Sequence, residues 1–239
     1  MPEPVLLIVN ADDFGYSPGV NQGIIQSHVQ GIVTSTSLMV RGAAIDLAVQ
    51  YCRDHPLLSV GLHLDFGEWI FRNGEWRALY TVVPLEDLRL VEAEIDRQLK
   101  QFRTLLQREP SHIDSHQHVH RNEQARNSVM KIAKEIGVPL RHFGPARYRG
   151  DFYGQPILGE SCRESVSAEA LVQIIRTLDA GITELACHPG IGQDHTSDYS
   201  QERNWETASL CDPNVRAAIE LHAVQLCSFD SPVVRSRCV

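Results

Sequence analysis

The chain has 239 residues, of which 43% are hydrophobic and 22% are charged, and it carries a formal net charge of −8. This length and composition predict one ordinary globular domain, spanning residues 1–239, with a substantial core. The acidic balance and the lack of a basic stripe argue against nucleic acid as a partner. Since no apolar run approaches the roughly 20 residues of a membrane span, we expect no membrane-spanning segment.

Apolar and β-branched runs alternate with segments of helical periodicity along most of the chain. In chain order, we predict strand 4–10, helix 20–30, strand 35–40, helix 43–53, strand 59–64, helix 86–108, strand 112–114, helix 122–136, strand 139–142, helix 168–179, strand 183–187, helix 212–222 and strand 224–229. Repeated strand–helix units favour a parallel, barrel-like α/β fold.

Three segments interrupt this alternation. Residues 65–85 contain several aromatic side chains, and they predict an excursion or short hairpin over the active-site face. Residues 143–166 are rich in Gly, Pro and Arg and permit no assignment. Residues 190–210 are polar, so we predict a long loop there.

The cysteines and the first residues bear on location. The six cysteines form no Cys-x-x-Cys pair, which is typical of reduced, mostly buried thiols in a cytosolic protein. They are Cys52, Cys162, Cys187, Cys211, Cys227 and Cys238. The sequence begins Met1-Pro2-Glu3-Pro4 and enters a strand-like run at once, without a basic region or a leader-length apolar stretch. We therefore expect no signal peptide and a cytoplasmic location.

The adjacent acids Asp12 and Asp13 are the most informative residues, because they directly follow the apolar run 5–10. Such a run predicts a buried parallel strand, and α/β folds place their chemistry at the carboxyl ends of strands. If the chain is still extended there, one carboxylate can bind a metal while the other approaches the water on it. The competing interpretation is that the two acids cap a turn or a helix.

Histidines follow three later strand-like runs, at His63, in the segment 112–120 and at His188. The middle segment is the densest, with four histidines around Asp114: His112, His116, His118 and His120. Imidazole is the commonest metal ligand near neutral pH, and Asp114 is a candidate partner for the second ring nitrogen of a ligand. One carboxylate with two imidazoles suits a catalytic divalent cation. The competing interpretations are a surface histidine patch and, for His63, a hydrogen-bonded core residue.

Five segments between residue 5 and about residue 190 carry a resemblance to a known family. They are Asn10-Ala11-Asp12-Asp13-Phe14-Gly15, Thr34-Ser35-Thr36, Gly61-Leu62-His63, Asp114-Ser115-His116-Gln117-His118-Val119-His120 and His188-Pro189-Gly190. Together they resemble the YdjC-like carbohydrate deacetylases, which include chitooligosaccharide deacetylases and hopanoid-biosynthesis-associated deacetylases. Many members have a further histidine where this chain has Gln117. The segments 65–85 and 143–166 differ from the chitooligosaccharide enzymes, so the resemblance does not specify the sugar.

The resemblance implies a single-domain, distorted (β/α) barrel, similar to a TIM barrel, with mostly parallel strands. It also implies one divalent metal ion, zinc or magnesium, held by Asp13, His63 and His116. In the implied reaction an acetyl group is removed from an N-acetylated amino sugar or its conjugate, with Asp12 as general base. His188 is implied as the group near the leaving amine.

We expect His120 and Trp69 to contact the substrate. Trp69, Trp76 and Tyr80 either stack on sugar faces or form the small core of the excursion. Two imidazoles favour zinc over magnesium on ligand grounds. The sequence leaves a homodimer open.

Two alternatives compete with the deacetylase hypothesis. One is another barrel metal hydrolase, such as a phosphoesterase or a cyclic-amide hydrolase, which a count of two metals per chain would favour. The other is a non-catalytic sugar-binding protein, which would bind acetamido sugars without releasing acetate.

Overall fold

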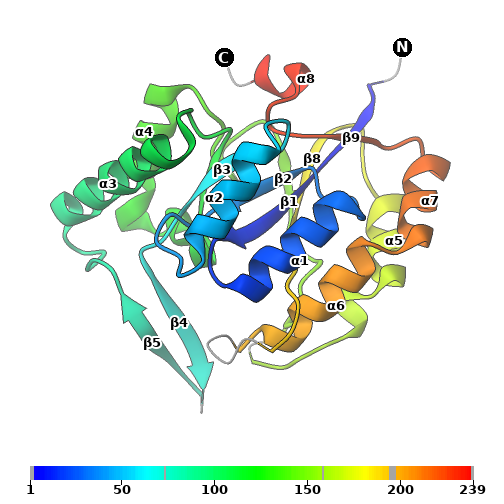
Figure 1. Ribbon diagram of the computed structural model, residues 1–239, viewed down its shortest axis with the longest axis horizontal. Coiled ribbons are helices and arrows are strands. Elements are labelled where there is room, and N and C mark those ends of the chain that lie inside the picture. Colours follow the sequence, from blue (N-terminus) through cyan, green and yellow to red (C-terminus); the bar gives the residue numbers. More distant parts are fainter. Residues whose placement is uncertain (1–2, 73, 158, 194–197, 238–239) are drawn as a thin grey trace.

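A seven-stranded parallel sheet forms the centre of the molecule (Figure 1). The computed structural model describes residues 3–72, 74–157, 159–193 and 198–237. The strands of this sheet are β1 (Val5–Phe14), β2 (Ser35–Leu38), β3 (Ser59–Leu64), β6 (Ile113–Ser115), β7 (Arg147–Arg149), β8 (Gly181–Cys187) and β9 (Gln225–Cys227). Their order is β6-β3-β2-β1-β8-β7, with β9 paired to β1. The expected α/β fold with mostly parallel strands is therefore confirmed, and β6 and β7 are the edges of an open barrel in the described part of the chain.

Helices connect the parallel strands and surround the sheet (Figure 1). They are α1 (Pro18–Val29), α2 (Ile45–Asp54), α3 (Leu88–Leu106), α4 (Glu123–Ile136), α5 (Ala168–Arg176), α6 (Ser200–Leu210), α7 (Pro213–Leu221) and the short α8 (Pro232–Arg235). In Figure 1, α1 and α2 lie in front of the sheet, α3 and α4 to the left, and α5, α6 and α7 to the right. Two 3-10 helices, η1 (His116–Arg121) and η2 (Glu164–Val166), complete the regular elements of the described residues. Side-chain caps begin several helices; for example, the Asp87 carboxylate accepts from the backbone of Arg89 and Leu90 at the start of α3.

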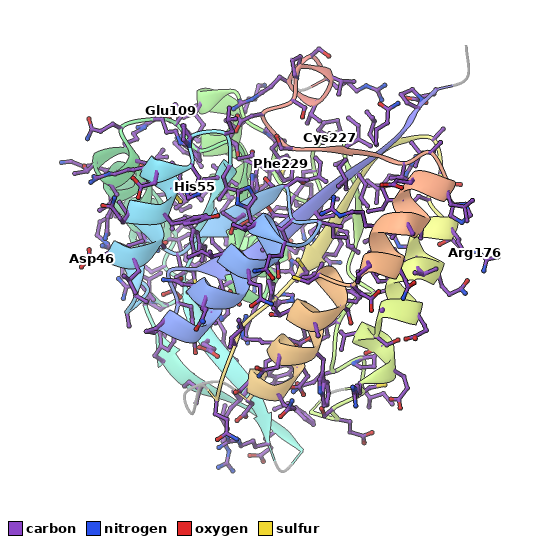
Figure 2. All side chains as sticks on the ribbon, turned by 45° about the vertical axis from the view of Figure 1, so that its right-hand side comes forward. Asp46, His55, Glu109, Arg176, Cys227 and Phe229 are labelled. Carbon is purple, nitrogen blue, oxygen red and sulfur yellow. The ribbon has the colours of Figure 1, made fainter. Side chains whose placement is uncertain are left out.

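β1 is the central strand and the longest, and its residues from Leu6 to Phe14 are all buried. It pairs with β2 on one side and β8 on the other, so its carboxyl end lies in the middle of the sheet's carboxyl edge. Away from this edge, the ring of His112 stacks on Phe229 with 3.8 Å between ring centroids. Phe229, labelled in Figure 2, lies between β9 and α8, and both side chains are buried. His112 is therefore a buried core residue.

β4 (Gly67–Arg72) and β5 (Glu75–Thr81) form an antiparallel hairpin in the excursion after β3. The hairpin extends from the end of the molecule opposite the two termini (Figure 1). The Tyr80 hydroxyl donates to the Asp65 carboxylate over 3.1 Å, which fixes the returning strand to the end of β3.

Two predicted elements are wrong. Residues 139–142 form no strand, because only Leu140 bridges to Ile113. The predicted loop 190–210 contains helix α6, whose buried face is polar and includes Glu202, Arg203 and Glu206. A helix without an apolar stripe gives no amphipathic signal, which explains the wrong prediction. In the segment without an assignment, 143–166, the structure has β7 and η2.

The described cysteines form no disulfide: Cys52, Cys162, Cys187, Cys211 and Cys227 are free, and Cys238 lies outside the described residues. Among the described helices, none combines the length and the apolar character needed to cross a membrane.

Candidate metal centre and active site

A bulge at the end of β1 places both acids in one cavity. The pairing of β1 with β2 shifts register between Ala11 and Phe14, and Asp13 has a left-handed backbone with φ of 70°. In a regular strand neighbouring side chains point to opposite faces, whereas Asp12 and Asp13 both line the same cavity here. Such a backbone costs about 1–3 kcal/mol in a residue other than glycine, and it is typical of functional sites.

Asp13, His63 and His116 converge at the carboxyl edge of the sheet. Asp13 Oδ1 lies 3.2 Å from His63 Nε2 and 3.0 Å from His116 Nδ1, and the three ligand atoms all lie within 4.8 Å of one another. Two bonds of about 2.1 Å to one cation separate their donor atoms by about 3.0–3.4 Å at octahedral or tetrahedral angles. The three side chains, all buried, therefore have the spacing of a ligand set.

In His63 and Asp13, the polar atom that would not bind the cation is held by a hydrogen bond to another side chain. His63 Nδ1 donates to Asp114 Oδ1 over 2.8 Å, which leaves Nε2 directed at Asp13. Arg203 Nη2 donates to Asp13 Oδ2 over 2.6 Å, which leaves Oδ1 for the imidazoles. Such outer contacts orient metal ligands in proteins.

Buried charge around this centre is mostly negative. Six carboxyl groups are buried there: Asp12, Asp13, Glu68, Asp114, Glu184 and Glu206. Burial outweighs the Arg141 charge at Glu184 and raises its pKa to about 7, so this group is only partly charged near neutral pH. Two buried guanidiniums, Arg141 and Arg203, oppose these carboxyl groups. Because unpaired buried charge is costly, this surplus favours a bound cation. The same field acts on His63: burial opposes protonation, but Asp114, Asp13 and Asp12 outweigh it and raise the pKa of His63 to about 10.

Asp12 is held in place by a buried arginine. Arg141 Nη1 and Nη2 donate to the two Asp12 oxygens over 2.6 and 2.7 Å, and Asn10 Nδ2 adds a bond of 2.8 Å to Oδ1. Burial raises the pKa of Asp12, but the Arg141 charge outweighs it, so the pKa lies below its usual value and the group is ionised. Arg141 also pairs with Asp114 and Glu184, over 2.8 and 2.7 Å.

This arginine also excludes a further combination of possible ligands. Asp12, His63 and Asp114 have ligand atoms within 4.8 Å of one another. Arg141, however, already bridges the two carboxylates.

His188 follows β8 and lies next to Asp12 in the cavity. Its Nε2 lies 3.8 Å from Asp12 Oδ2, and its Nδ1 lies 3.8 Å from Glu206 Oε1 on α6. Its side chain is 20% exposed, so it can reach a bound molecule. Burial lowers the pKa of His188, but the carboxylate of Glu206 outweighs it and raises the pKa above its usual value. An imidazole of this kind can act as a proton donor near neutral pH.

The cavity over these groups has a volume of about 600 Å³. Aromatic side chains form much of its wall: Trp69, Trp76, Tyr148, Phe152, Tyr153 and Tyr199. Trp69 and Trp76 come from the β4–β5 hairpin, and Gln117 bonds to both backbone groups of Trp69, which fixes the hairpin against η1. A cavity with a charged floor and aromatic walls can hold a polar molecule with flat faces.

The structure brings together five of the seven predicted site residues at the cavity floor: Asp12, Asp13, His63, His116 and His188. Trp69 lies in the cavity wall. The predicted substrate contact of His120 is a different case, because this side chain is fully buried and lies outside the residues that line the cavity. Burial removes it from the reach of a substrate.

Sequence reasoning missed three residues of the site, Arg141, Arg203 and Glu206. Arg141 follows an edge bridge, and the other two lie on the polar helix α6. The pattern Glu202-Arg203-x-x-Glu206-Thr207 places charges at helical spacing, which is the one signal that indicates a buried polar helix face.

An open, parallel α/β barrel with carboxylates and imidazoles gathered at its carboxyl edge has the arrangement in which barrel enzymes place their active sites. The chain belongs to the YdjC-like protein family, whose model matches residues 6–221. A carbohydrate deacetylase of Brevibacillus brevis is 33% identical, covering 93% of this chain and 98% of its own. A chitooligosaccharide deacetylase of Citrobacter koseri is 34% identical, covering 94% and 98%.

A solved structure supports the fold. A family 4 carbohydrate esterase from Streptomyces lividans, in complex with acetate, has a TM-score of 0.58 and 15% identity, covering 95% of this chain and 92% of its own. At this identity the likeness extends to the fold alone.

Proposed function

We propose that this protein is a metal-dependent hydrolase that removes the acetyl group from an N-acetylated amino sugar or its conjugate. The observation that carries the proposal is the convergence of Asp13, His63 and His116 beside Asp12 and His188 in one aromatic-walled cavity. The names of the two deacetylase relatives, which match over nearly the whole chain, support the same reaction and a carbohydrate substrate.

The cation is a divalent ion, zinc or magnesium, and Asp13, His63 and His116 would hold it. Their spacing and the buried negative surplus fit such an ion. When bound, the ion supplies Lewis-acid chemistry, because it polarises a carbonyl oxygen and makes a water more acidic. With two imidazoles in the set, zinc fits better than magnesium, which prefers oxygen ligands.

Asp12 is the general base. Arg141 occupies both of its oxygens from the protein side, so the carboxylate keeps one orientation, toward the cavity and His188. Each oxygen still has a lone pair for the proton of an attacking water. Because the pKa of Asp12 is lowered, the carboxylate is ionised throughout the neutral range, as a general base must be before it takes up a proton.

His188 is the general acid. Amide hydrolysis releases an amine, which needs a proton as the carbon–nitrogen bond breaks. Glu206 raises the pKa of His188, so the imidazolium that donates this proton is available near neutral pH. Asp12 and His188 thus lie next to each other at the cavity floor, with 3.8 Å between Oδ2 and Nε2, where both would face one acetamide group.

The sugar ring would stack on Trp69. The indole lies in the cavity wall, and its position is fixed by the two bonds between its backbone and Gln117. A flat aromatic face suits the apolar face of a sugar ring. Trp76 extends the same wall and is more than half exposed, which suits a longer or conjugated substrate.

The test is acetate release from N-acetylglucosamine and its oligomers, with zinc or magnesium added to metal-free protein. The Asp12→Asn variant should bind the cation and the sugar but release almost no acetate. Asp46→Asn is a matched control on the outer face of α2, where Figure 2 shows Asp46 pointing away from the molecule. Acetate release by Asp12→Asn at the rate of the control would contradict the assigned base.

A further inference from the structure

Three histidines outside the centre described above form a second group: His118 and His120 on η1, and His142 in the loop after Leu140. One ring nitrogen of each lies within 4.8 Å of the others. We infer that this histidine group is a second cation site, separate from the centre of Asp13, His63 and His116, and that it takes zinc or a similar transition metal.

The spacing of the three rings matches one tetrahedral ion. The ring centroids of His118, His120 and His142 are 5.8, 5.1 and 5.5 Å apart. Zinc–nitrogen bonds of about 2.1 Å, with each ring centre about 1.2 Å beyond its nitrogen, place ring centres about 5.4 Å apart at the tetrahedral angle. The two imidazoles of the first centre, His63 and His116, have nearly the same separation, 5.7 Å.

Hydroxyl groups lie within hydrogen-bonding distance of two of the three rings, at the nitrogen that is not directed into the group. Tyr148 Oη lies 3.1 Å from His118 Nε2, and Ser115 Oγ lies 2.8 Å from His120 Nδ1. In each ring the other nitrogen is left for the interior of the group. His118 Nδ1 lies 3.4 Å from His142 Nε2 there. A metal-binding histidine typically donates its second N–H to a neighbouring oxygen in this way.

A buried, unpartnered nitrogen of His120 is further evidence that the group binds a ligand. The His120 side chain is fully buried, and its Nε2 has no hydrogen-bond partner anywhere in the described residues. A buried polar atom without a partner costs about 1–3 kcal/mol. A cation within this group would satisfy that nitrogen.

The backbone is also strained at two of the three residues. His118 and His142 have left-handed conformations with φ of 56° and 68°. Such conformations cost about 1–3 kcal/mol each in residues other than glycine. In both cases the strain directs the ring into the group, so a bound ion would offset part of it.

The ligand chemistry selects the ion. The group contains imidazoles and no carboxylate, which suits zinc, cobalt, nickel or copper and not magnesium or calcium. Arg141 lies beside the group with its guanidinium over the Tyr148 ring, but three carboxylates already offset its charge.

The two cation sites do not form a shared two-metal centre, in which the ions lie about 3.5–4 Å apart and catalyse together. They have no residue in common. The histidine group lies between the active-site cavity and an open groove: His118 lines both, and His142, Arg121 and Arg126 line the groove. An ion there would hold η1, the segment that begins with His116, so its role is to fix the position of a ligand of the first centre.

The test counts zinc ions bound to metal-free protein in competition with a coloured chelator. The variants are Asp13→Asn, His142→Asn and the double variant, with His222→Asn as a control that removes an exposed histidine elsewhere. Asparagine tolerates the left-handed backbone of His142, so the substitution removes the imidazole with little added strain. Unfolding midpoints without metal verify that each variant is folded.

We expect two zinc ions per chain in the native protein and in His222→Asn, one in each single-site variant, and none in the double variant. Zinc should also raise the unfolding midpoint of Asp13→Asn but not that of the double variant. If Asp13→Asn alone abolishes zinc binding, the histidine group is only a hydrogen-bonded cluster. If Asp13→Asn and the double variant bind zinc equally, the same conclusion follows. If Asp13→Asn retains both ions, the first centre is wrong while the second stands.

Discussion

The two proposed cation sites have nearly the same ring spacing but different surroundings. The rings of His63 and His116 are 5.7 Å apart beside several buried carboxylates, whereas those of His118 and His142 are 5.1 Å apart beside the guanidiniums of Arg121 and Arg141. Only the first site forms the floor of the aromatic-walled cavity between Asp12 and His188. The difference indicates that ring spacing alone does not define a reactive centre, because a base, an acid and access for a substrate are also needed.

The largest effect is expected from a substitution that disrupts the first site and leaves the second intact. Asp13→Ala removes the ligand that lies between His63 and His116, and acetate release should fall by about 10³-fold or more, since a Lewis acid supplies several kcal/mol. His142→Ala should leave most of the turnover. Rates measured with saturating zinc, alongside metal counts, check both variants. Equal losses in the two variants would contradict the division of roles.

A smaller loss should follow from Asp12→Asn. The amide still accepts from Arg141 but takes up a proton poorly, so turnover should fall by about 10²–10⁴-fold, the usual contribution of a general base. The first site should keep its cation, because Asp12 lies outside its ligand set. Acetate assays and metal analysis on one preparation test both expectations. A variant that loses cation and activity together would show that Asp12 is a ligand.

The pH profile tests the acid in the first site. Because Glu206 raises the pKa of His188, the protonated form persists to higher pH, and activity should fall only as the pH rises through that raised value. Glu206→Gln removes the negative charge but keeps a group that can bond to Tyr199. The falling alkaline limb of kcat should therefore move to lower pH. An unmoved limb, with full metal occupancy, would exclude His188 as the group that Glu206 tunes.

The smallest expected effect concerns the cavity wall. Trp69→Ala should raise KM for an N-acetylated sugar by about 3–10-fold with little change in kcat, as expected for the loss of one aromatic stacking contact. Leu79→Ala, an exposed position on the same hairpin, is the control. Steady-state kinetics on both variants separate the two constants. A loss in kcat alone for Trp69→Ala would indicate that the indole positions the reacting group.

The sequence allowed most strands and the convergence of the cavity-floor residues to be predicted. Apolar runs identified the parallel strands, and the strands' carboxyl ends must meet at one edge. Asp13, His63 and His116 therefore came together from three distant segments. Their catalytic and metal-binding roles remain predictions.

The polar half of the site was beyond sequence reasoning. Arg203 and Glu206 lie on a helix that buries charge, and hydrophobic periodicity cannot detect such a face. Arg141 follows a single bridge instead of a strand. His120 lies four residues beyond His116, but the left-handed backbone of Gln117 and His118 interrupts η1 between them, and His120 does not line the cavity. Its burial depends on tertiary packing, which local pattern does not reveal.

The central claim is that Asp13, His63 and His116 hold one cation in the active site, and anomalous diffraction from zinc-loaded crystals tests it most directly. The account predicts a peak within about 2.0–2.2 Å of Asp13 Oδ1, His63 Nε2 and His116 Nδ1. Crystals that contain zinc but show no peak at these three atoms would contradict it.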